Sequence, residues 1–203
     1  GDWEPVMEQI ERRHCDLSRD LGIGISVELE HHFADLRKMA SGIHLIGEVS
    51  DRLRARVMST GELMATRIGA SFLASTGLDV QWLDARTILH AEERAGATAR
   101  ANYLSATCNF EPDPALQQRL AQGGSVLPTQ GFIASDANGE TVLLGRGGSD
   151  TSGSYLAAKL HARRLEIWTD VPGMFTANPR QVPNARLLKS LDYDEAQEIA
   201  SSG

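Results

Sequence analysis

The segment 145–150, with the sequence GRGGSD, gathers the groups best suited to hold an anion. It follows a short apolar run at 141–144 and precedes a stretch with the apolar spacing of a helix, so we expect a turn between a strand and a helix. The free N–H groups and positive dipole end of a helix N-terminus attract phosphate or carboxylate. Arg146 adds a planar guanidinium that can hold either anion through two bonds.

Within this turn, Gly147 and Gly148 would let the backbone approach a ligand closely. Ser149 is expected to cap the helix, and Asp150 lies in its first turn. The same residues are also compatible with a turn that only joins a strand to a helix, with Arg146 in solvent. The spacing matches neither a P-loop nor a Rossmann fingerprint, because Asp150 stands where the third Rossmann glycine belongs.

A second polar segment begins with Thr169 and Asp170, directly after the apolar run 165–168, where we expect the next strand. Two strands joined by a helix would form a right-handed βαβ unit, and ligands bind such sheets at the carboxyl ends of the strands. A hydroxyl and a carboxylate at that edge suit nucleotide recognition. The alternative is a loop in which Asp170 caps its own backbone.

Apolar spacing and turn residues predict the elements that position these segments. Helices are expected over residues 4–21, 27–46, 51–57, 63–76, 113–121, 150–163 and 194–202. Strands are expected over residues 80–83, 125–133, 141–144 and 165–168, with a hairpin turn at 136–139. The helix that follows the glycine turn is expected to bury Leu156, Ala157 and Leu160.

The composition is that of a soluble globular protein, with 41% hydrophobic and 23% charged residues in a chain of 203. A net charge of −7 argues against nucleic acid or an anionic membrane as a partner. The sequence has no apolar run of membrane-spanning length and no signal-peptide pattern, so we expect a cytoplasmic protein. Cys15 and Cys108 lack metal-binding spacing and are expected to be free thiols, with a disulfide between them as the alternative. His31 and His32 are adjacent on a predicted helix and therefore do not suggest a metal site.

Four blocks of the sequence, in order, resemble the aspartate kinase branch of the amino acid kinase family. They are MSTGELMA at 58–65, LPTQGFIA at 127–134, GRGGSDTSGSYLAAKL at 145–160 and WTDVPGMFTANPR at 168–180. The fourth block occurs in several branches, whereas the third is more selective for aspartate kinase. The resemblance implies an α/β fold of the carbamate kinase-like type, a three-layer αβα sandwich with a mostly parallel sheet. It places residues 1–203 in one catalytic domain, with a mostly helical region at 1–57 and a substrate- and ATP-binding region at 58–203.

The resemblance also implies roles for residues around the glycine turn. Arg146 would clamp a carboxylate of the substrate, and Glu62 would hold its ammonium group. The backbone donors near the reacting groups would come from Gly147, Gly148 and Ser149, and Asp150 would orient a catalytic lysine. Taken without the resemblance, Glu62 is also compatible with a simple helix start.

ATP and Mg are the cofactors that the resemblance implies. Thr169, Asp170, Phe175 and Arg180 would bind ATP, and no residue of this chain is assigned to a metal. Phe175 would pack near the adenine at a position where many relatives have tyrosine, and Arg180 would contact a phosphate. The alternative for Arg180 is a solvated side chain. Phe132 could be a wall of the substrate pocket or an ordinary core residue.

The implied reaction is phosphorylation of the side-chain carboxylate of L-aspartate to 4-phospho-L-aspartate, the first step of lysine, threonine and methionine biosynthesis. Another branch, acting on glutamate or acetylglutamate, and a non-catalytic regulatory subunit are the alternatives. The family's KFGG-type block with its lysine, and its K-V-x-H-P segment, do not occur in this sequence. The chain is therefore expected to be a central fragment, truncated at both ends and inactive alone, of a protein that is a homo-oligomer. Some relatives are also fused to a decarboxylase of lysine synthesis.

Overall fold

The computed structural model describes residues 3–202 and divides into two units, with the boundary between Leu165 and Glu166. Unit 1 contains three long helices, a small sheet and three shorter helices, whereas unit 2 contains one helix and an irregular hairpin.

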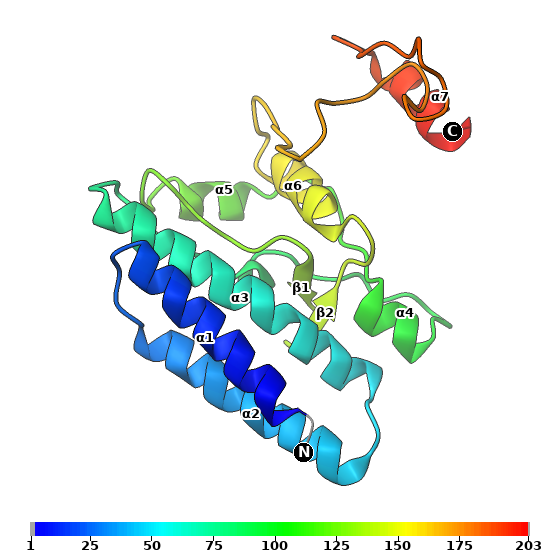
Figure 1. Cartoon of the computed structure of the whole chain (residues 1–203). Helices are drawn as coiled ribbons and strands as arrows, with labels where there is room; N and C mark the ends of the chain where they lie inside the picture. The colour runs from blue at the N-terminus through cyan, green and yellow to red at the C-terminus, as the bar shows by residue number, and fades with distance from the viewer. Residues whose placement is uncertain (1–2, 203) are drawn as a thin grey trace. The chain divides into compact units, whose positions relative to one another are not determined.

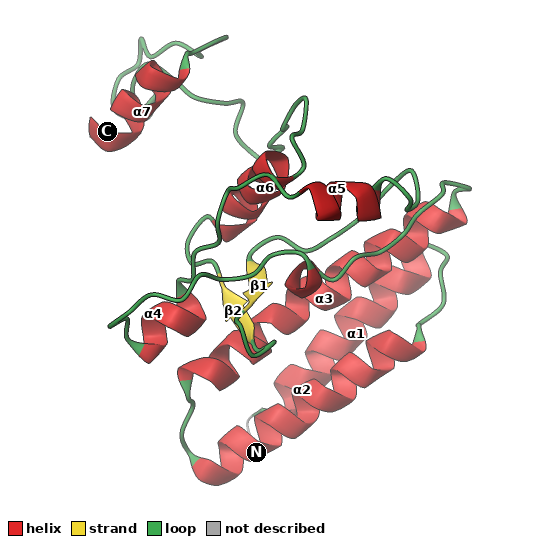
Figure 2. Ribbon diagram, turned by 180° about the vertical axis from the view of Figure 1, so that it is seen from behind, coloured by secondary structure: helices red, strands yellow, loops and turns green. Residues whose placement is uncertain are grey.

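Three helices form one layer of unit 1: α1 (Glu4–Asp20), α2 (Val27–Ile46) and α3 (Asp51–Ser75). They lie side by side in both views (Figures 1 and 2). Their shared core consists of Leu29, Phe33, Met64 and Ile68, with Ile10, Cys15, Leu21 and Ile23 packed against it. None of the helices in residues 3–202 is both long and apolar enough to span a bilayer.

Serine caps fix where two of these helices begin. Ser26 accepts the backbone N–H of Leu29 at 3.2 Å, and Ser50 accepts that of Leu53 at 3.2 Å. Each bond satisfies one of the N–H groups that a helix start leaves free, so both starts were predictable from the sequence. Gly47 ends α2 in the left-handed conformation, with φ of 75°.

Helix α3 is continuous, which corrects the prediction of two helices at 51–57 and 63–76. Gly61 lies inside it, exposed to solvent. A helical glycine costs about 1 kcal/mol relative to alanine. The buried residues Ala55, Leu63 and Met64 on either side of Gly61 outweigh that cost, because most helical stability in proteins comes from packing.

The middle layer is built around an antiparallel hairpin of β1 (Ile133–Ser135) and β2 (Thr141–Leu143). Asp136 closes the predicted turn, since its carboxylate accepts the N–H groups of Asn138 and Glu140. Ahead of the hairpin, the short 3-10 helix η1 (Ala85–Thr87) contacts β1.

Sheet pairing is more mixed than the mostly parallel arrangement that we expected. Parallel pairing occurs only at isolated bridges in the described residues, between Val80 and Val126 and between His90 and Ser135. The predicted strand 125–133 is interrupted because Phe132 has φ of 70°, outside the β region. The predicted strand 80–83 is likewise reduced to a short extended segment.

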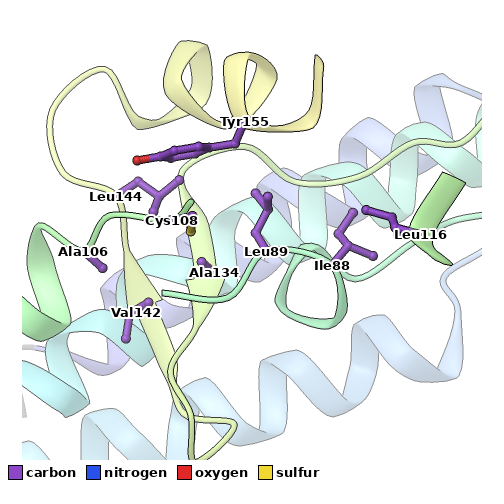
Figure 3. Packing of buried hydrophobic residues seen from close by; sticks show 9 residues of the cluster. All are labelled: Ile88, Leu89, Ala106, Cys108, Leu116, Ala134, Val142, Leu144 and Tyr155. Carbon is purple, nitrogen blue, oxygen red and sulfur yellow. The ribbon is translucent and has the colours of Figure 1, made fainter. Parts of the chain in front are cut away.

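The third layer contains α5 (Pro114–Leu120) and α6 (Gly148–Lys159), while α4 (Ala99–Leu104) contacts α3 and β2. Successive strand residues point to opposite faces. Ile133 and Leu143 join the cluster that contains Leu63 of α3. Their neighbours join the cluster under α5 and α6, formed by Ile88, Leu89, Ala106, Cys108, Leu116, Ala134, Val142, Leu144 and Tyr155. Figure 3 shows Tyr155 of α6 lying over Leu144, so unit 1 has the predicted αβα layering.

Helix α6 ends at Lys159, earlier than the predicted Arg163, because His161 turns to φ of 52° just after it. Its buried face carries Ser152, Tyr155 and Lys159. The residues predicted to be buried, Leu156, Ala157 and Leu160, are only partly so.

Unit 2 contains a short antiparallel hairpin and α7 (Tyr193–Ser202). Phe175 and Leu187 form an isolated antiparallel bridge. The predicted strand 165–168 is wrong: these residues are irregular, and Trp168 is 89% exposed. A strand needs a neighbour for its backbone hydrogen bonds, and no other described segment pairs with this run. Tyr193, at the start of α7, is 94% exposed.

Candidate functional site

The turn between β2 and α6 is made by two glycines in the left-handed conformation, Gly145 with φ of 78° and Gly147 with φ of 69°. Gly147 is the N-cap of α6 and has no side chain to cap it. The prediction that Ser149 caps the helix is therefore wrong, because the chain has already entered the helix at Gly148. Ser149 instead lies exposed in the first turn.

The start of α6 keeps backbone donors free for a ligand. The N–H of Gly148 donates to the carbonyl of Gly145 at 3.1 Å, and that of Thr151 donates to the carbonyl of Gly147 at 3.0 Å. Between them, the N–H groups of Ser149 and Asp150 have no acceptor within residues 3–202. Together with the dipole of α6, these two donors can bind an anion.

Arg146 and Asp150 flank these donors, and both side chains are exposed. In the described part of the chain neither makes an ion pair or a side-chain hydrogen bond. The Arg146 guanidinium is thus available to a carboxylate or phosphate. A separate loop also packs closely against this turn.

That loop is the segment 130–132, and its fit against α6 requires glycine on both sides. A Cβ on Gly131 would lie 2.8 Å from Cα of Ser149. A Cβ on Gly148 would lie 2.7 Å from Cδ2 and 3.1 Å from Cα of Phe132. Real Cβ atoms essentially never approach another heavy atom within 3.0 Å, so a larger residue at either glycine would force the loop and the helix apart.

The backbone of Phe132 holds this loop through two hydrogen bonds. Its N–H donates to Oγ of Ser152 at 2.8 Å, and its carbonyl accepts the N–H of Leu144 at 2.9 Å. These bonds hold a non-glycine residue at φ of 70°, the kind of strain that clusters at functional sites. The Phe132 side chain packs against the cluster that contains Leu63 and Leu143, which supports the core interpretation of this residue.

Gln130 connects the loop to the segment that carries Glu62. Its Oε1 accepts the N–H of Ala85 at 2.9 Å, and its Nε2 donates to Oγ1 of Thr66 at 2.7 Å. The Thr66 hydroxyl donates in turn to the backbone carbonyl of Glu62 at 2.8 Å. The structure therefore joins three sequence blocks that are far apart along the chain. The half-buried side chain of Glu62 makes no hydrogen bond of its own among the described residues.

The segment beneath this loop is held by Asp84 and Arg86. Burial acts to raise the pKa of the Asp84 carboxyl, but hydrogen bonds from the Arg86 side chain and backbone bring it below its ordinary value. Asp84 also caps η1, and Arg86 donates to Oγ1 of Thr141 on β2 at 3.1 Å. The backbone that donates to Gln130 is thereby fixed to the strands.

Sequence reasoning missed Gln130, Thr66 and Ser152 as parts of this site. Gln130 and Ser152 are 1% and 2% exposed, and their partners lie in other segments. The available signal was the polar pair at 129–130 within an otherwise apolar run, since a buried polar side chain needs a specific partner.

The residues predicted to bind ATP lie in unit 2. Thr169, Asp170 and Arg180 are exposed, and Phe175 is half-buried in the hairpin. The Asp170 carboxylate accepts the hydroxyl of Thr169 at 3.2 Å. In residues 3–202 it does not cap the backbone of its own loop, which was the alternative. The N–H of Arg180 donates to Oδ1 of Asn178 at 3.0 Å, a turn that orients the chain at Pro179.

This chain is similar to known proteins over most of its length. Residues 7–203 match the pattern of the amino acid kinase family. The chain is 38% identical over 176 residues to a bifunctional aspartokinase/homoserine dehydrogenase of Buchnera aphidicola, covering 86% of this chain and 21% of the relative. It is 36% identical over 179 residues to lysine-sensitive aspartokinase 3 of Escherichia coli, covering 88% of this chain and 38% of the relative.

A solved structure of an aspartokinase is also similar to this chain. The crystal structure of E. coli aspartokinase III with aspartate and ADP aligns with a TM-score of 0.71 and 34% identity, covering 87% of this chain and 38% of that one. The chain thus spans well under half the length of these relatives. The match over nearly all of its residues, together with the layered fold and the glycine turn, shows that the chain belongs to the amino acid kinase family.

Proposed function

We propose that the chain is the central part of an aspartate kinase, which transfers a phosphoryl group from Mg-ATP to the side-chain carboxylate of L-aspartate. The observation that carries this proposal is the convergence of three blocks at the start of α6, where Gly131 packs on Ser149 and Gln130 reaches the turn of Glu62. Relatives named as aspartokinases, one solved with aspartate and ADP, support the choice of substrate.

Arg146 and the free N–H groups of Ser149 and Asp150 suit the binding and orientation of a substrate with two carboxylates. Arg146 is exposed and unpaired in the described residues, so its guanidinium can take one carboxylate through two bonds. The backbone donors can stabilise negative charge without reorganising, which is the main contribution of a protein to phosphoryl transfer. In this proposal Glu62 holds the substrate's ammonium group, and Asp150 orients a catalytic lysine that this sequence does not contain.

Unit 2 carries a donor set that suits a nucleotide. Phe175 offers an apolar ring, Thr169 and Asp170 offer a hydroxyl and a carboxylate, and Arg180 offers an exposed guanidinium for phosphate. When bound, Mg-ATP supplies the phosphoryl group and neutralises charge at the reacting phosphates. In this proposal the metal ion arrives with the phosphates, and a homo-oligomeric, cytoplasmic enzyme is the natural setting for the reaction.

The test uses the natural protein that contains this sequence, assayed for ADP release and for acyl phosphate trapped by hydroxylamine. We expect turnover with L-aspartate, and little with glutamate or acetylglutamate. Arg146→Ala should reduce kcat/KM for aspartate by ~100-fold or more, since one preorganised charge contact contributes that much. Arg146→Lys should recover only part of it, because lysine lacks the planar fork.

Other outcomes would point elsewhere. Turnover of glutamate or acetylglutamate would place the protein in another branch, and ligand binding without turnover would indicate a regulatory subunit. Residues 1–203 alone should show almost no turnover, because the lysine expected for the family is not among them. Clear turnover by this fragment, abolished by Arg146→Ala, would show that the lysine is not essential.

A further inference from the structure

The side-chain amide of Gln130 is buried, and its hydrogen bonds are compatible with only one orientation of its oxygen and nitrogen. Its Oε1 accepts the N–H of Ala85 at 2.9 Å, and its Nε2 donates both to Thr66 at 2.7 Å and to the carbonyl of Leu83 at 3.3 Å. If the amide were turned over, its NH2 group would face the Ala85 N–H and its oxygen would face the Leu83 carbonyl. Both contacts would be repulsive, so the side chain is fixed.

The Thr66 hydroxyl uses its full capacity for hydrogen bonds, as donor and as acceptor. Its hydrogen goes to the carbonyl of Glu62 at 2.8 Å, and its two lone pairs accept Nε2 of Gln130 and Nε1 of Trp82, the latter at 3.1 Å. The Trp82 ring also contacts Arg67, whose guanidinium lies over it, 3.5 Å from the ring centre. One hydroxyl therefore ties the Glu62 turn of α3 to two other segments.

The same loop continues directly into the start of α6. Gly131 packs against Ser149, and the Phe132 N–H donates to Ser152, which lies on the buried face of α6. A shift of Gln130 would therefore move the loop against the free N–H groups of Ser149 and Asp150. The hydrogen bonds of Gln130 connect the Glu62 turn to the start of α6, and the Gln130 side chain is itself only 1% exposed.

We infer that Gln130 and Thr66 are positioning residues, which set the spacing between the Glu62 turn of α3 and the anion-binding start of α6. The inference rests on the proposed function for its kinetic consequence. The spacing between these two groups determines whether one small substrate can bind both of them at once. Misplacement of such groups by about 1 Å can cost roughly 100-fold in rate, even when the altered residue is remote from the chemistry.

The decisive comparison uses three variants of α3 in the natural full-length protein. Thr66→Val keeps the shape but removes the hydroxyl, Thr66→Ser keeps the hydroxyl, and Thr60→Val is the matched control. Thr60 is buried in α3, whereas Thr66 is half-buried. Like Thr66, it donates to the carbonyl four residues earlier, that of Arg56, at 2.9 Å, but it does not bond to Gln130. Gln130→Met is a second way to remove the bonds at nearly constant volume.

We expect Thr66→Val and Gln130→Met to lower kcat/KM for aspartate by about 10- to 100-fold, with KM for aspartate raised and KM for ATP near that of the unaltered protein. Thr66→Ser and Thr60→Val should remain close to the unaltered protein. Assays are run below the melting temperature of every variant. If Thr66→Val and Thr60→Val have equal kinetics, or if Thr66→Ser loses as much as Thr66→Val, the inference is wrong.

Amide hydrogen exchange provides a readout that does not depend on the reaction. The N–H groups of Ala85 and Phe132 should exchange about tenfold faster in Thr66→Val and Gln130→Met than in Thr60→Val, because loss of the bonds allows local opening. Unchanged exchange would overturn the inference even if activity fell. Faster exchange in a protein that does not phosphorylate aspartate would support the coupling and reject only the proposed function.

Discussion

The two groups of candidate site residues are held in different ways. Around the start of α6, the backbone is fixed by partners far away in sequence, such as Gln130 and Thr66, which are 64 residues apart. In unit 2, the candidate residues are held by near neighbours, such as Asp170 beside Thr169 and Asn178 beside Arg180.

This difference indicates how each group would work. Groups fixed by buried long-range bonds are preorganised, and they suit the charge stabilisation on which phosphoryl transfer depends. Residues on an exposed hairpin tolerate local change and suit binding of a nucleotide. We therefore expect substitutions near α6 to alter both stability and kcat, and substitutions in unit 2 to alter mainly KM for ATP.

Among the substitutions that test this difference, Gly131→Ala should have the largest effect. The new Cβ would lie 2.8 Å from Cα and 2.9 Å from Cβ of Ser149, where backbone on both sides prevents adjustment. Overpacking of this kind costs about 1–3 kcal/mol. We expect urea unfolding to show that loss, together with a fall in kcat for aspartate of roughly 100-fold from misplaced donors. A stable Gly131→Ala protein with normal kcat would contradict the preorganised site.

A change in unit 2 should have a smaller and separable effect. Phe175→Ala is expected to raise KM for ATP about 2- to 10-fold, because an aromatic contact contributes about 0.5–1.5 kcal/mol beyond its buried area. KM for aspartate should not change. Phe175→Tyr, which keeps the ring and adds a hydroxyl that can hydrogen-bond, should lower KM for ATP. An equal rise in both KM values after Phe175→Ala would remove the distinction between the two groups.

Titration and labelling of Cys108 report whether the core of unit 1 excludes solvent. Burial raises the pKa of its thiol to about 11 from an ordinary value of 9.0. Between those values the unfolded thiol ionises while the folded one stays protonated, so ionisation favours the unfolded state. Stability should therefore fall as pH rises from about 9 to about 11, and Cys108→Ala should reduce that slope in denaturant titrations. A maleimide that labels folded Cys108 at neutral pH would show that the core opens.

The smallest expected effect is an increase in stability, at Gly61. Gly61 is exposed in the middle of α3, and a Cβ built on it meets no atom within 4 Å. Gly61→Ala should therefore stabilise the protein by about 1 kcal/mol, through helix propensity alone. The melting temperature should rise by about 2–4 °C. Gly61→Ala is also the control for Gly131→Ala, because it adds the same methyl group at a position where space is available.

Local sequence signals predicted the local structure well. The predicted helix starts at residues 27, 51 and 113 agree with the structure to within one residue, and the DANG turn at 136–139 joins β1 and β2. In each case the cap or turn bonds lie within a few residues. Helix α3 was wrongly divided at Gly61 because packing against α2 and the strands, which local sequence does not show, outweighs glycine's cost.

The candidate site was only partly predictable, for the same reason. The sequence GRGGSD correctly predicted a glycine turn between β2 and α6, while anion binding there and the role of Arg146 stay predictions. Gln130 and Ser152 were missed because their roles depend on partners in distant segments. The strand predicted at 165–168 failed because β-propensity cannot supply the neighbouring strand.

The two-sided packing of α3 has a consequence for folding. On one side it meets α2, its neighbour in sequence, and on the other it meets Ile133 and Leu143 of the distant hairpin. Contacts close in sequence form faster than distant ones, because less chain must be ordered to make them. We therefore expect the α1–α3 layer to gain amide protection early, and the turn at α6 to gain it last. Pulse-labelled hydrogen exchange during refolding would show this order, and simultaneous protection of both layers would refute it.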